Sequence, residues 1–146
     1  MRVEGMKSAS GFRFERILVW QKAMGWTRRI YEFTGSFPDS ERFGLSAQLR
    51  RAAVSVPSNI AEGSSRATNA DFARFVEIAY GSLMESVCQC RLATDLGYLP
   101  AAAYDILRDQ SDEIARMLSG LRNYLVTKKN TKLRELPALY GVAADS

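Results

Sequence analysis

A proline in the middle of a helical pattern is the feature that most constrains the fold of this chain. The segment 45–63 places apolar residues three or four positions apart on both sides of Pro57. These residues are Leu45, Leu49, Ala53, Val56 and Ile60. A proline inside a helix donates no hydrogen bond to the carbonyl four residues earlier and clashes with it, at a cost of about 3 kcal/mol. Because the apolar register continues across Pro57, the pattern predicts a kinked helix that tertiary packing holds in place.

Three further helical patterns accompany this segment. The four helices are expected at residues 15–33, 41–62, 69–96 and 100–127. Thr68 suits the N-cap of the third helix, and Gly97 followed by Pro100 is typical of one helix ending and the next beginning. Short connections favour antiparallel neighbours. The sequence therefore predicts an all-α fold, an antiparallel up-and-down four-helix bundle with a Pro-kinked second helix.

Two glycines in these patterns have different expected roles. Gly63 follows the last apolar position of the second helix and suits the C′ position that ends a helix. Gly81 lies inside the third helix, where it costs up to about 1 kcal/mol relative to alanine. A close approach of another helix would explain Gly81.

Composition and charge limit the class of protein. The 146 residues, 47% hydrophobic and 25% charged, suit one globular domain. We expect a flexible lead at 1–12, the bundle at 13–127 and a basic, flexible tail at 128–146. The chain shows neither a signal peptide nor a run of about 18 apolar residues, so a cytoplasmic protein without a membrane span is expected. A net charge of +4 is common among ordinary proteins and also suits a nucleic-acid partner.

The sequence offers little catalytic chemistry. It contains no histidine, which removes the commonest general base and the commonest metal ligand. Cys88 and Cys90 point to different faces of the predicted third helix and cannot complete a tetrahedral zinc site by themselves. Glu77 and Glu85 are two helical turns apart, too far for joint chelation, and Gly-rich phosphate motifs are absent. We therefore expect no enzyme, no catalytic residue, no cofactor and no metal.

The first helix carries two apolar stripes, whereas a surface helix of a monomer needs one. One stripe contains Ile17, Trp20, Met24, Thr27 and Tyr31, and the other contains Leu18 or Val19, Ala23, Trp26, Ile30 and Phe33. Either a second copy of the chain covers one stripe, or the helix lies in a groove between two helices of its own chain. The first interpretation makes four residues candidates for an oligomer interface: Trp20, Met24, Trp26 and Tyr31.

Basic side chains are candidates for contacts with a nucleic-acid backbone. The candidates are Arg28, Arg29, Arg50, Arg51, Arg66, Lys128 and Lys129. Arg50 and Arg51 are adjacent and diverge by about 100°, so at most one can face inward. In a structural interpretation they join Asn59, Glu62 and Arg66 as a polar group that fixes the kinked helix against a neighbour. The two lysines also suit a solvated helix end, where they complement the helix dipole.

Several motifs, in order along the chain, resemble a known family. They are VWQKA at 19–23, FP at 37–38, FGLSAQLRRAAVSVPSNIAEG at 43–63, GSLMES at 81–86 and LGYL at 96–99. Together with the Arg66, Phe72 and Phe75 positions, they resemble the four-helix-bundle proteins encoded by intervening sequences of bacterial 23S ribosomal RNA genes, over about residues 12–126. That family is similar to the accessory variability proteins of diversity-generating retroelements, basic pentameric barrels that engage a reverse transcriptase and nucleic acid.

The resemblance implies an antiparallel four-helix bundle that assembles as a homopentamer, with no established enzyme activity and no assigned catalytic residue. The implied partners are further copies of the chain and RNA or DNA. The expected function is a non-catalytic scaffold that binds nucleic acid or ribonucleoprotein through basic patches. The alternative is a structural or protein-interaction module without a nucleic-acid role.

Overall fold

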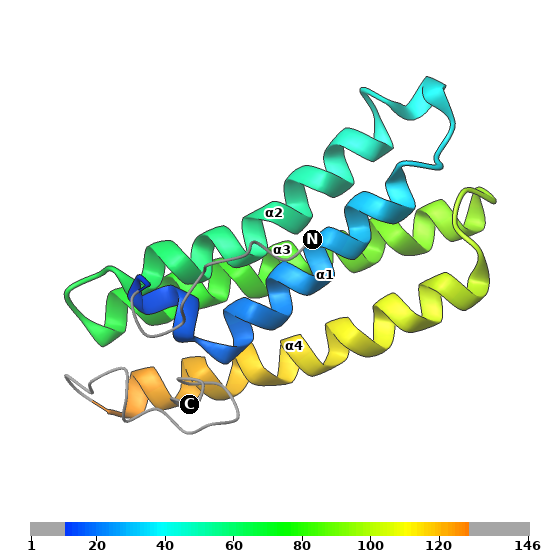
Figure 1. The fold of residues 1–146 in the computed structure, drawn as a ribbon. Coiled ribbons are helices and arrows are strands. Elements are labelled where there is room, and N and C mark those ends of the chain that lie inside the picture. Colours follow the sequence, from blue (N-terminus) through cyan, green and yellow to red (C-terminus); the bar gives the residue numbers. More distant parts are fainter. Residues whose placement is uncertain (1–10, 129–146) are drawn as a thin grey trace.

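Four long helices form the computed structural model, which describes residues 11–128 (Figure 1). They are α1 (Leu18–Thr34), α2 (Leu45–Ser64), α3 (Asn69–Asp95) and α4 (Ala101–Thr127), with the short 3-10 turns η2 (Arg13–Arg16) before α1 and η3 (Asp39–Glu41) before α2. The described part of the chain has no strand, so the predicted all-α, four-helix class is confirmed. The expectations for residues 1–10 and 129–146, Lys129 among them, lie outside the described residues.

Contacts between neighbouring helices define the direction of each helix. Thr27 contacts Ala53, and Thr34 contacts Arg50, so numbers rise along α1 as they fall along α2. The same opposite numbering is found between α2 and α3 at Ser55–Ser82 and Gly63–Phe75. It is also found between α3 and α4 at Glu77–Arg122 and Arg91–Tyr104, and between α1 and α4 at Lys22–Glu113 and Trp26–Leu107. Neighbouring helices are therefore antiparallel, as the ribbon in Figure 1 also shows.

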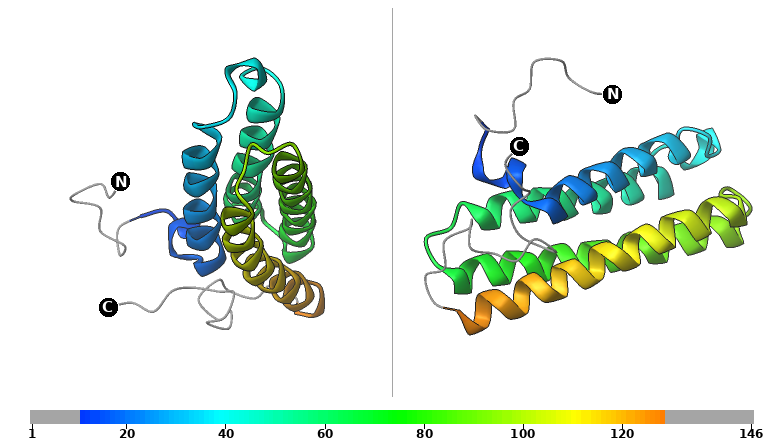
Figure 2. Two further views of the ribbon diagram at one scale, coloured as in Figure 1. Left: turned by 90° about the vertical axis from the view of Figure 1, so that its right-hand side faces the viewer. Right: turned by 60° about the horizontal axis from the view of Figure 1, so that its bottom comes forward.

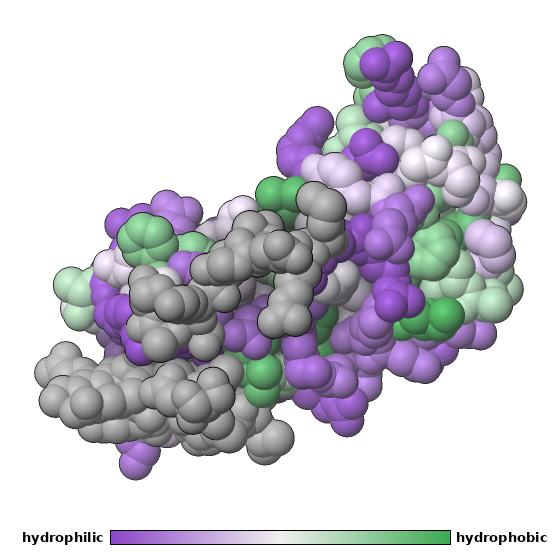
Figure 3. All heavy atoms as spheres, viewed as in Figure 1, coloured by the Kyte–Doolittle hydropathy of each residue, from purple (hydrophilic) through white to green (hydrophobic). Residues whose placement is uncertain are grey.

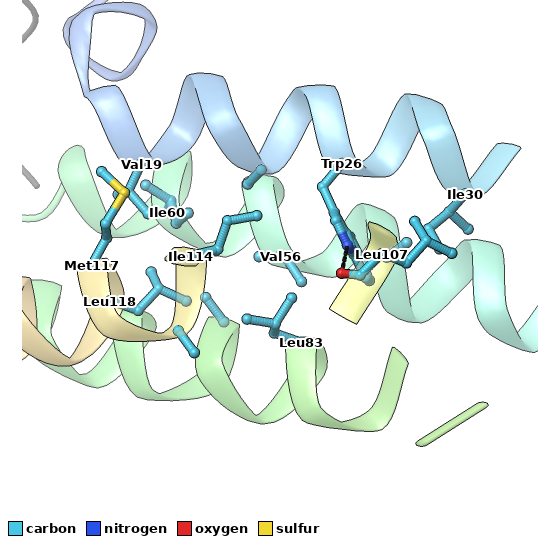
Figure 4. Packing of buried hydrophobic residues seen from close by; sticks show 14 of the residues in the cluster. Val19, Trp26, Ile30, Val56, Ile60, Leu83, Leu107, Ile114, Met117 and Leu118 are labelled. Carbon is cyan, nitrogen blue, oxygen red and sulfur yellow. Dashed lines mark hydrogen bonds between the residues drawn. The ribbon is translucent and has the colours of Figure 1, made fainter. Parts of the chain in front are cut away.

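Two helical hairpins form the two layers of the molecule. Figure 2 shows α1 beside α2 in one layer and α3 beside α4 in the other. The interface between α2 and α3 is the most extensive and that between α1 and α4 the smallest. Large side chains from all four helices meet between the layers, and burial of each stabilises the fold by about 1.5–3 kcal/mol (Figure 4). The largest fully buried ones include Trp26, Ile30, Leu49, Ile60, Leu83, Leu107, Ile114 and Leu118.

The start of α2 differs from the expected position. The pattern predicted a helix from residue 41, but residues 39–41 form η3 and α2 begins at Leu45. Glu41 folds back toward this helix, and its Oε1 accepts a hydrogen bond of 3.1 Å from the Leu45 N–H. Its Oε2 accepts a 3.1 Å hydrogen bond from the Tyr98 hydroxyl, which raises the pKa of Tyr98 because the carboxylate stabilises the protonated phenol. A carboxylate in the preceding turn therefore caps α2.

The predicted boundaries of α3 agree with the structure to within one residue. The Thr68 hydroxyl accepts a hydrogen bond of 3.1 Å from the Asp71 N–H, which confirms the predicted N-cap. Gly97 adopts φ +81°, a conformation that favours glycine and ends the helix. Among the described residues, no helix is both long enough and apolar enough to cross a membrane.

Neither glycine has the role expected of it. Gly63 lies inside α2, which continues to Ser64. A Cβ atom there would lie 2.6 Å from Phe75 Cβ and 2.9 Å from Phe72 Cδ1, so the missing side chain lets α3 approach α2 closely. Gly81 is exposed, and nothing lies within 4 Å of the position its Cβ would take. The expected close approach at Gly81 is therefore wrong within the described part of the chain.

The helix α2 continues through the buried residue Pro57. Since proline has no N–H, the carbonyl of Ala53 lacks its helical donor. The Thr27 hydroxyl of α1 lies 3.2 Å from this oxygen and 2.8 Å from the carbonyl oxygen of Ala23. One hydroxyl proton is therefore shared between carbonyls of two helices, and a side chain of α1 replaces the hydrogen bond that Pro57 cannot donate. The kink at Pro57 stays a prediction.

We expect Thr27→Val to lower the free energy of unfolding by about 1–3 kcal/mol, because the buried carbonyl of Ala53 then has no donor. In a Pro57→Ala background the N–H of residue 57 can serve that carbonyl, so Thr27→Val should cost less there. Urea unfolding of the parent, the two single variants and the double variant measures this coupling. An equal cost of Thr27→Val in both backgrounds would show that the hydroxyl does not compensate the proline.

Candidate nucleic-acid interface

The described residues contain no group of three or more His, Cys, Asp or Glu side chains that could hold a metal ion. Cys88 is exposed and Cys90 is buried, so the prediction that they face different ways is confirmed. Burial raises the pKa of the Cys90 thiol to about 12, which keeps it protonated and inert. Glu77 forms an ion pair with Arg122, and Glu85 accepts a hydrogen bond of 3.3 Å from the Gln89 amide.

Arg50 ties the start of α2 to the end of α1. Its Nε donates a hydrogen bond of 2.7 Å to the Thr34 hydroxyl, and its Nη2 donates one of 3.3 Å to the carbonyl of Tyr31. The guanidinium also lies over the Tyr31 ring, 4.6 Å from its centroid. Because the last carbonyls of a helix lack helical donors, these contacts stabilise the C-terminal turn of α1. The structural interpretation thus accounts for two of the three guanidinium nitrogens.

The other members of the predicted polar group do not gather around Arg50. Arg66 donates a hydrogen bond of 3.1 Å to Glu62, and its guanidinium lies 4.6 Å from the centroid of the Phe75 ring. Asn59 donates instead to the backbone carbonyl of Ser55 at 2.7 Å. The predicted group is therefore three separate local arrangements spread along α2.

Three of the candidate arginines have no partner within residues 11–128. Arg28 on α1 and Arg51 on α2 are exposed, and neither takes part in a hydrogen bond or ion pair with a described residue. Arg29 is half-buried and lines a groove of about 280 Å³ between α1 and α4. Lys128 is exposed at the end of α4, and its backbone carbonyl accepts a hydrogen bond of 2.6 Å from Asn69.

Basic and acidic side chains are unequally distributed between the two hairpins. Residues 11–68 contain nine basic and five acidic side chains, whereas residues 69–127 contain five basic and eight acidic ones. Four of the five arginines on α3 and α4 form ion pairs, which are Arg74–Asp71, Arg91–Asp95, Arg116–Asp112 and Arg122–Glu77. Unpaired positive charge therefore gathers on the α1–α2 hairpin, which makes this hairpin the candidate nucleic-acid interface.

The second apolar stripe of α1 packs against other helices of the same chain. Trp26 is 2% exposed, and its Nε1 donates a hydrogen bond of 3.1 Å to the carbonyl of Leu107 on α4 (Figure 4). Its own bundle therefore already covers Trp26, while its place in an oligomer interface stays a prediction. Trp20 and Met24 are half-buried, and the Trp20 ring packs edge-on against Phe14 with centroids 5.0 Å apart. Tyr31, at 44% exposure, is the most accessible of the four candidates.

Apolar side chains are exposed along the outer face of α3, which the sequence reasoning missed. Between 37% and 50% of each of these side chains is exposed: Ile78, Tyr80, Met84, Leu92 and Leu96. Gly81 and Cys88 lie on the same face. The signal in the sequence was a second set of apolar positions, offset from core positions such as Val76 and Leu83. This face is therefore a candidate for contact with another protein surface.

The antiparallel helices define an all-α bundle, and the unpaired arginines lie on its α1–α2 hairpin. The description "23S rRNA-intervening sequence protein" belongs to the family model that matches residues 15–120 of this chain. That match covers more than half of the chain, which therefore belongs to this family.

The fold is also found in solved structures. One of them is the 1.70 Å crystal structure of a protein with unknown function from the S23 ribosomal protein family of Bacteroides thetaiotaomicron. The two chains are 24% identical and superpose with a TM-score of 0.65, over 69% of this chain and 94% of the other. A search of curated proteins gives no match.

Proposed function

We propose that this chain is a non-catalytic, homopentameric scaffold that binds nucleic acid or ribonucleoprotein through the exposed arginines of the α1–α2 hairpin. The observation that carries the proposal is the separation of charge. Most arginines of α3 and α4 are in ion pairs, whereas Arg28 and Arg51 are exposed and have no partner among the described residues. Such guanidinium groups attract phosphate and release its counterions. We also propose a cytoplasmic location, where the exposed thiol of Cys88 would stay reduced.

The outer face of α3 supports the assembly part of the proposal. Its exposed apolar side chains lie on the hairpin opposite to the unpaired arginines, so copies can meet through α3 and leave α1 and α2 accessible. Five copies at +4 each carry a formal charge of +20, which strengthens the attraction of the assembly for a phosphate backbone.

Binding is tested by fluorescence anisotropy with labelled RNA and DNA over a series of salt concentrations. The variant Arg28→Gln/Arg51→Gln should bind more weakly, and the slope of log K against log salt should fall by about 1–2, since two phosphate contacts are lost. The matched control Arg74→Gln/Arg116→Gln removes two exposed arginines that are already in ion pairs, and should change binding little. No binding by the parent protein at low salt would contradict the nucleic-acid role.

Light scattering tests the assembly. The parent protein should have the mass of a pentamer, and Ile78→Glu/Met84→Glu should reduce this mass, because two charges would enter the apolar face of α3. Ile106→Glu is the control, since Ile106 on α4 is similarly exposed at 45%. A parent protein that is monomeric and binds no nucleic acid would favour the alternative function, in which the apolar face of α3 binds a different protein.

A further inference from the structure

A pocket of about 400 Å³ opens where the chain turns from α1 into α2. Its lining includes Arg42, Phe43, Ser46, Ala47 and Arg50, which belong to the connection after η3 and to the first turns of α2. This corner projects at one end of the molecule (cyan in Figure 1), and in Figure 3 it carries strongly hydrophilic residues beside a hydrophobic one. Only Arg50 in this lining was a sequence candidate.

Hydrogen-bond donors without partners lie in this pocket. Ser46 is 8% exposed, yet its hydroxyl makes no hydrogen bond to any described residue. The backbone N–H groups of Ser46 and Ala47 belong to the first turn of the twenty-residue helix α2 and also have no acceptor in the described chain. Glu41 occupies only the preceding N–H, that of Leu45. The unpartnered hydroxyl of a buried serine and two N–H groups at a helix N-terminus are a donor set that suits an anion.

Positive side chains line the same pocket. Arg42 forms no ion pair with a described residue, and its guanidinium lies 5.3 Å from the centroid of the Phe43 ring. The Nη1 of Arg50 makes no hydrogen bond, so it can donate into the pocket. Asp39 is the acidic residue of the lining, and the carboxylate of Glu41 is engaged by the Leu45 N–H and the Tyr98 hydroxyl. The attraction of an anion by two arginines, the hydroxyl and the helix dipole therefore exceeds its repulsion by one aspartate.

Phe43 adds a platform for a flat, apolar group. Its side chain is 88% exposed, the highest value among the large hydrophobic residues that the structure describes. An aromatic ring next to a phosphate site is the usual arrangement for holding unpaired bases, and stacking of one base contributes about 1–3 kcal/mol. In a duplex the bases are stacked on each other and cannot reach such a ring, so Phe43 favours single strands.

We propose that this pocket binds a phosphate group of single-stranded nucleic acid, with the base of a neighbouring nucleotide stacked on Phe43. The inference rests on the nucleic-acid part of the proposed function and goes beyond it by naming the form of the strand and the residues that hold it. Ser46, Ala47, Arg42 and Arg50 contact the phosphate, and Phe43 contacts the base.

The test uses anisotropy with a labelled single-stranded RNA 12-mer and the matching blunt duplex. Phe43→Ala should weaken binding of the single strand about tenfold and leave the duplex unchanged. Ser46→Asp, which places a negative charge in the pocket, should weaken both the single strand and inorganic phosphate. Phe12→Ala is the control, because Phe12 is an exposed aromatic residue, at 74%, on another part of the chain. Circular dichroism of each variant confirms that the bundle is folded.

The outcomes separate the pocket from the proposed function. In one outcome, Arg28→Gln/Arg51→Gln weakens binding of the single strand, whereas Phe43→Ala and Ser46→Asp leave it unchanged. This result would overturn the proposed pocket and keep the proposed function. In a second outcome, inorganic phosphate shifts the amide NMR signals of Ser46 and Ala47, but Phe43→Ala does not change RNA binding. The pocket would then bind only an adventitious phosphate ion, and the proposal for single strands would be overturned. A parent protein that binds neither RNA form would overturn both.

Discussion

Gly63→Leu is expected to prevent the bundle from folding, and Gly63→Ala is expected to lower the free energy of unfolding by about 1–3 kcal/mol. The reason is the close approach of α3 at this point, where an added Cβ would lie 2.6 Å from Phe75 Cβ and 2.9 Å from Phe72 Cδ1. A Cβ atom is not the movable end of a side chain, so relief requires the backbones of α2 and α3 to separate. That separation would loosen the most extensive interface in the molecule.

Gly81→Ala is the matched control, because Gly81 is also helical and its missing Cβ would meet nothing within 4 Å. Alanine should stabilise this exposed helix position by about 0.5–1 kcal/mol, since it restricts the unfolded chain and favours the helix. Guanidinium unfolding of the parent and both alanine variants measures the opposite signs. Equal changes at the two glycines would contradict a close approach of the helices at Gly63.

Local signals in the sequence were enough to predict most of the fold. Thr68 and Gly97 act at the ends of helices through their own hydroxyl group and backbone conformation, so a short stretch of sequence contains the whole cause. The roles of Gly63 and Gly81 depend on which helix faces them, and this is fixed by residues far away in the chain. A glycine near the end of a helical pattern therefore suggested a cap, although its actual role is at the contact with Phe75.

The candidate site shows the same division. The angle between neighbouring helical residues predicts that Arg50 and Arg51 diverge, but only the position of α1 decides that Arg50 contacts Thr34 and Arg51 stays exposed. The pocket beside Ser46 could not be predicted, because it depends on α2 beginning at Leu45 rather than at residue 41. Phe43, an aromatic residue beside Arg42 in an expected helix start, was the one signal of this pocket in the sequence.

Trp26→Ala is expected to lower the free energy of unfolding by about 3–5 kcal/mol, the usual loss for a large aromatic side chain in a core. The Trp26 ring is 2% exposed between α1 and α4, the pair of helices with the smallest interface in the bundle. Few other contacts can therefore compensate for its loss. The carbonyl of Leu107 would also lose the hydrogen bond that it accepts from Trp26 Nε1 at 3.1 Å.

Trp20→Ala is the control, since Trp20 is half-buried on the same helix and should cost less than Trp26→Ala. Urea unfolding measures stability, and light scattering on dilution measures assembly of the variants that remain folded. If Trp26 acts within its own chain, Trp26→Ala lowers stability while the concentration at which the assembly dissociates stays unchanged. A variant of parental stability that dissociates at higher concentration would instead assign Trp26 to the contact between copies, and the packing of α1 against α4 would then need another cause.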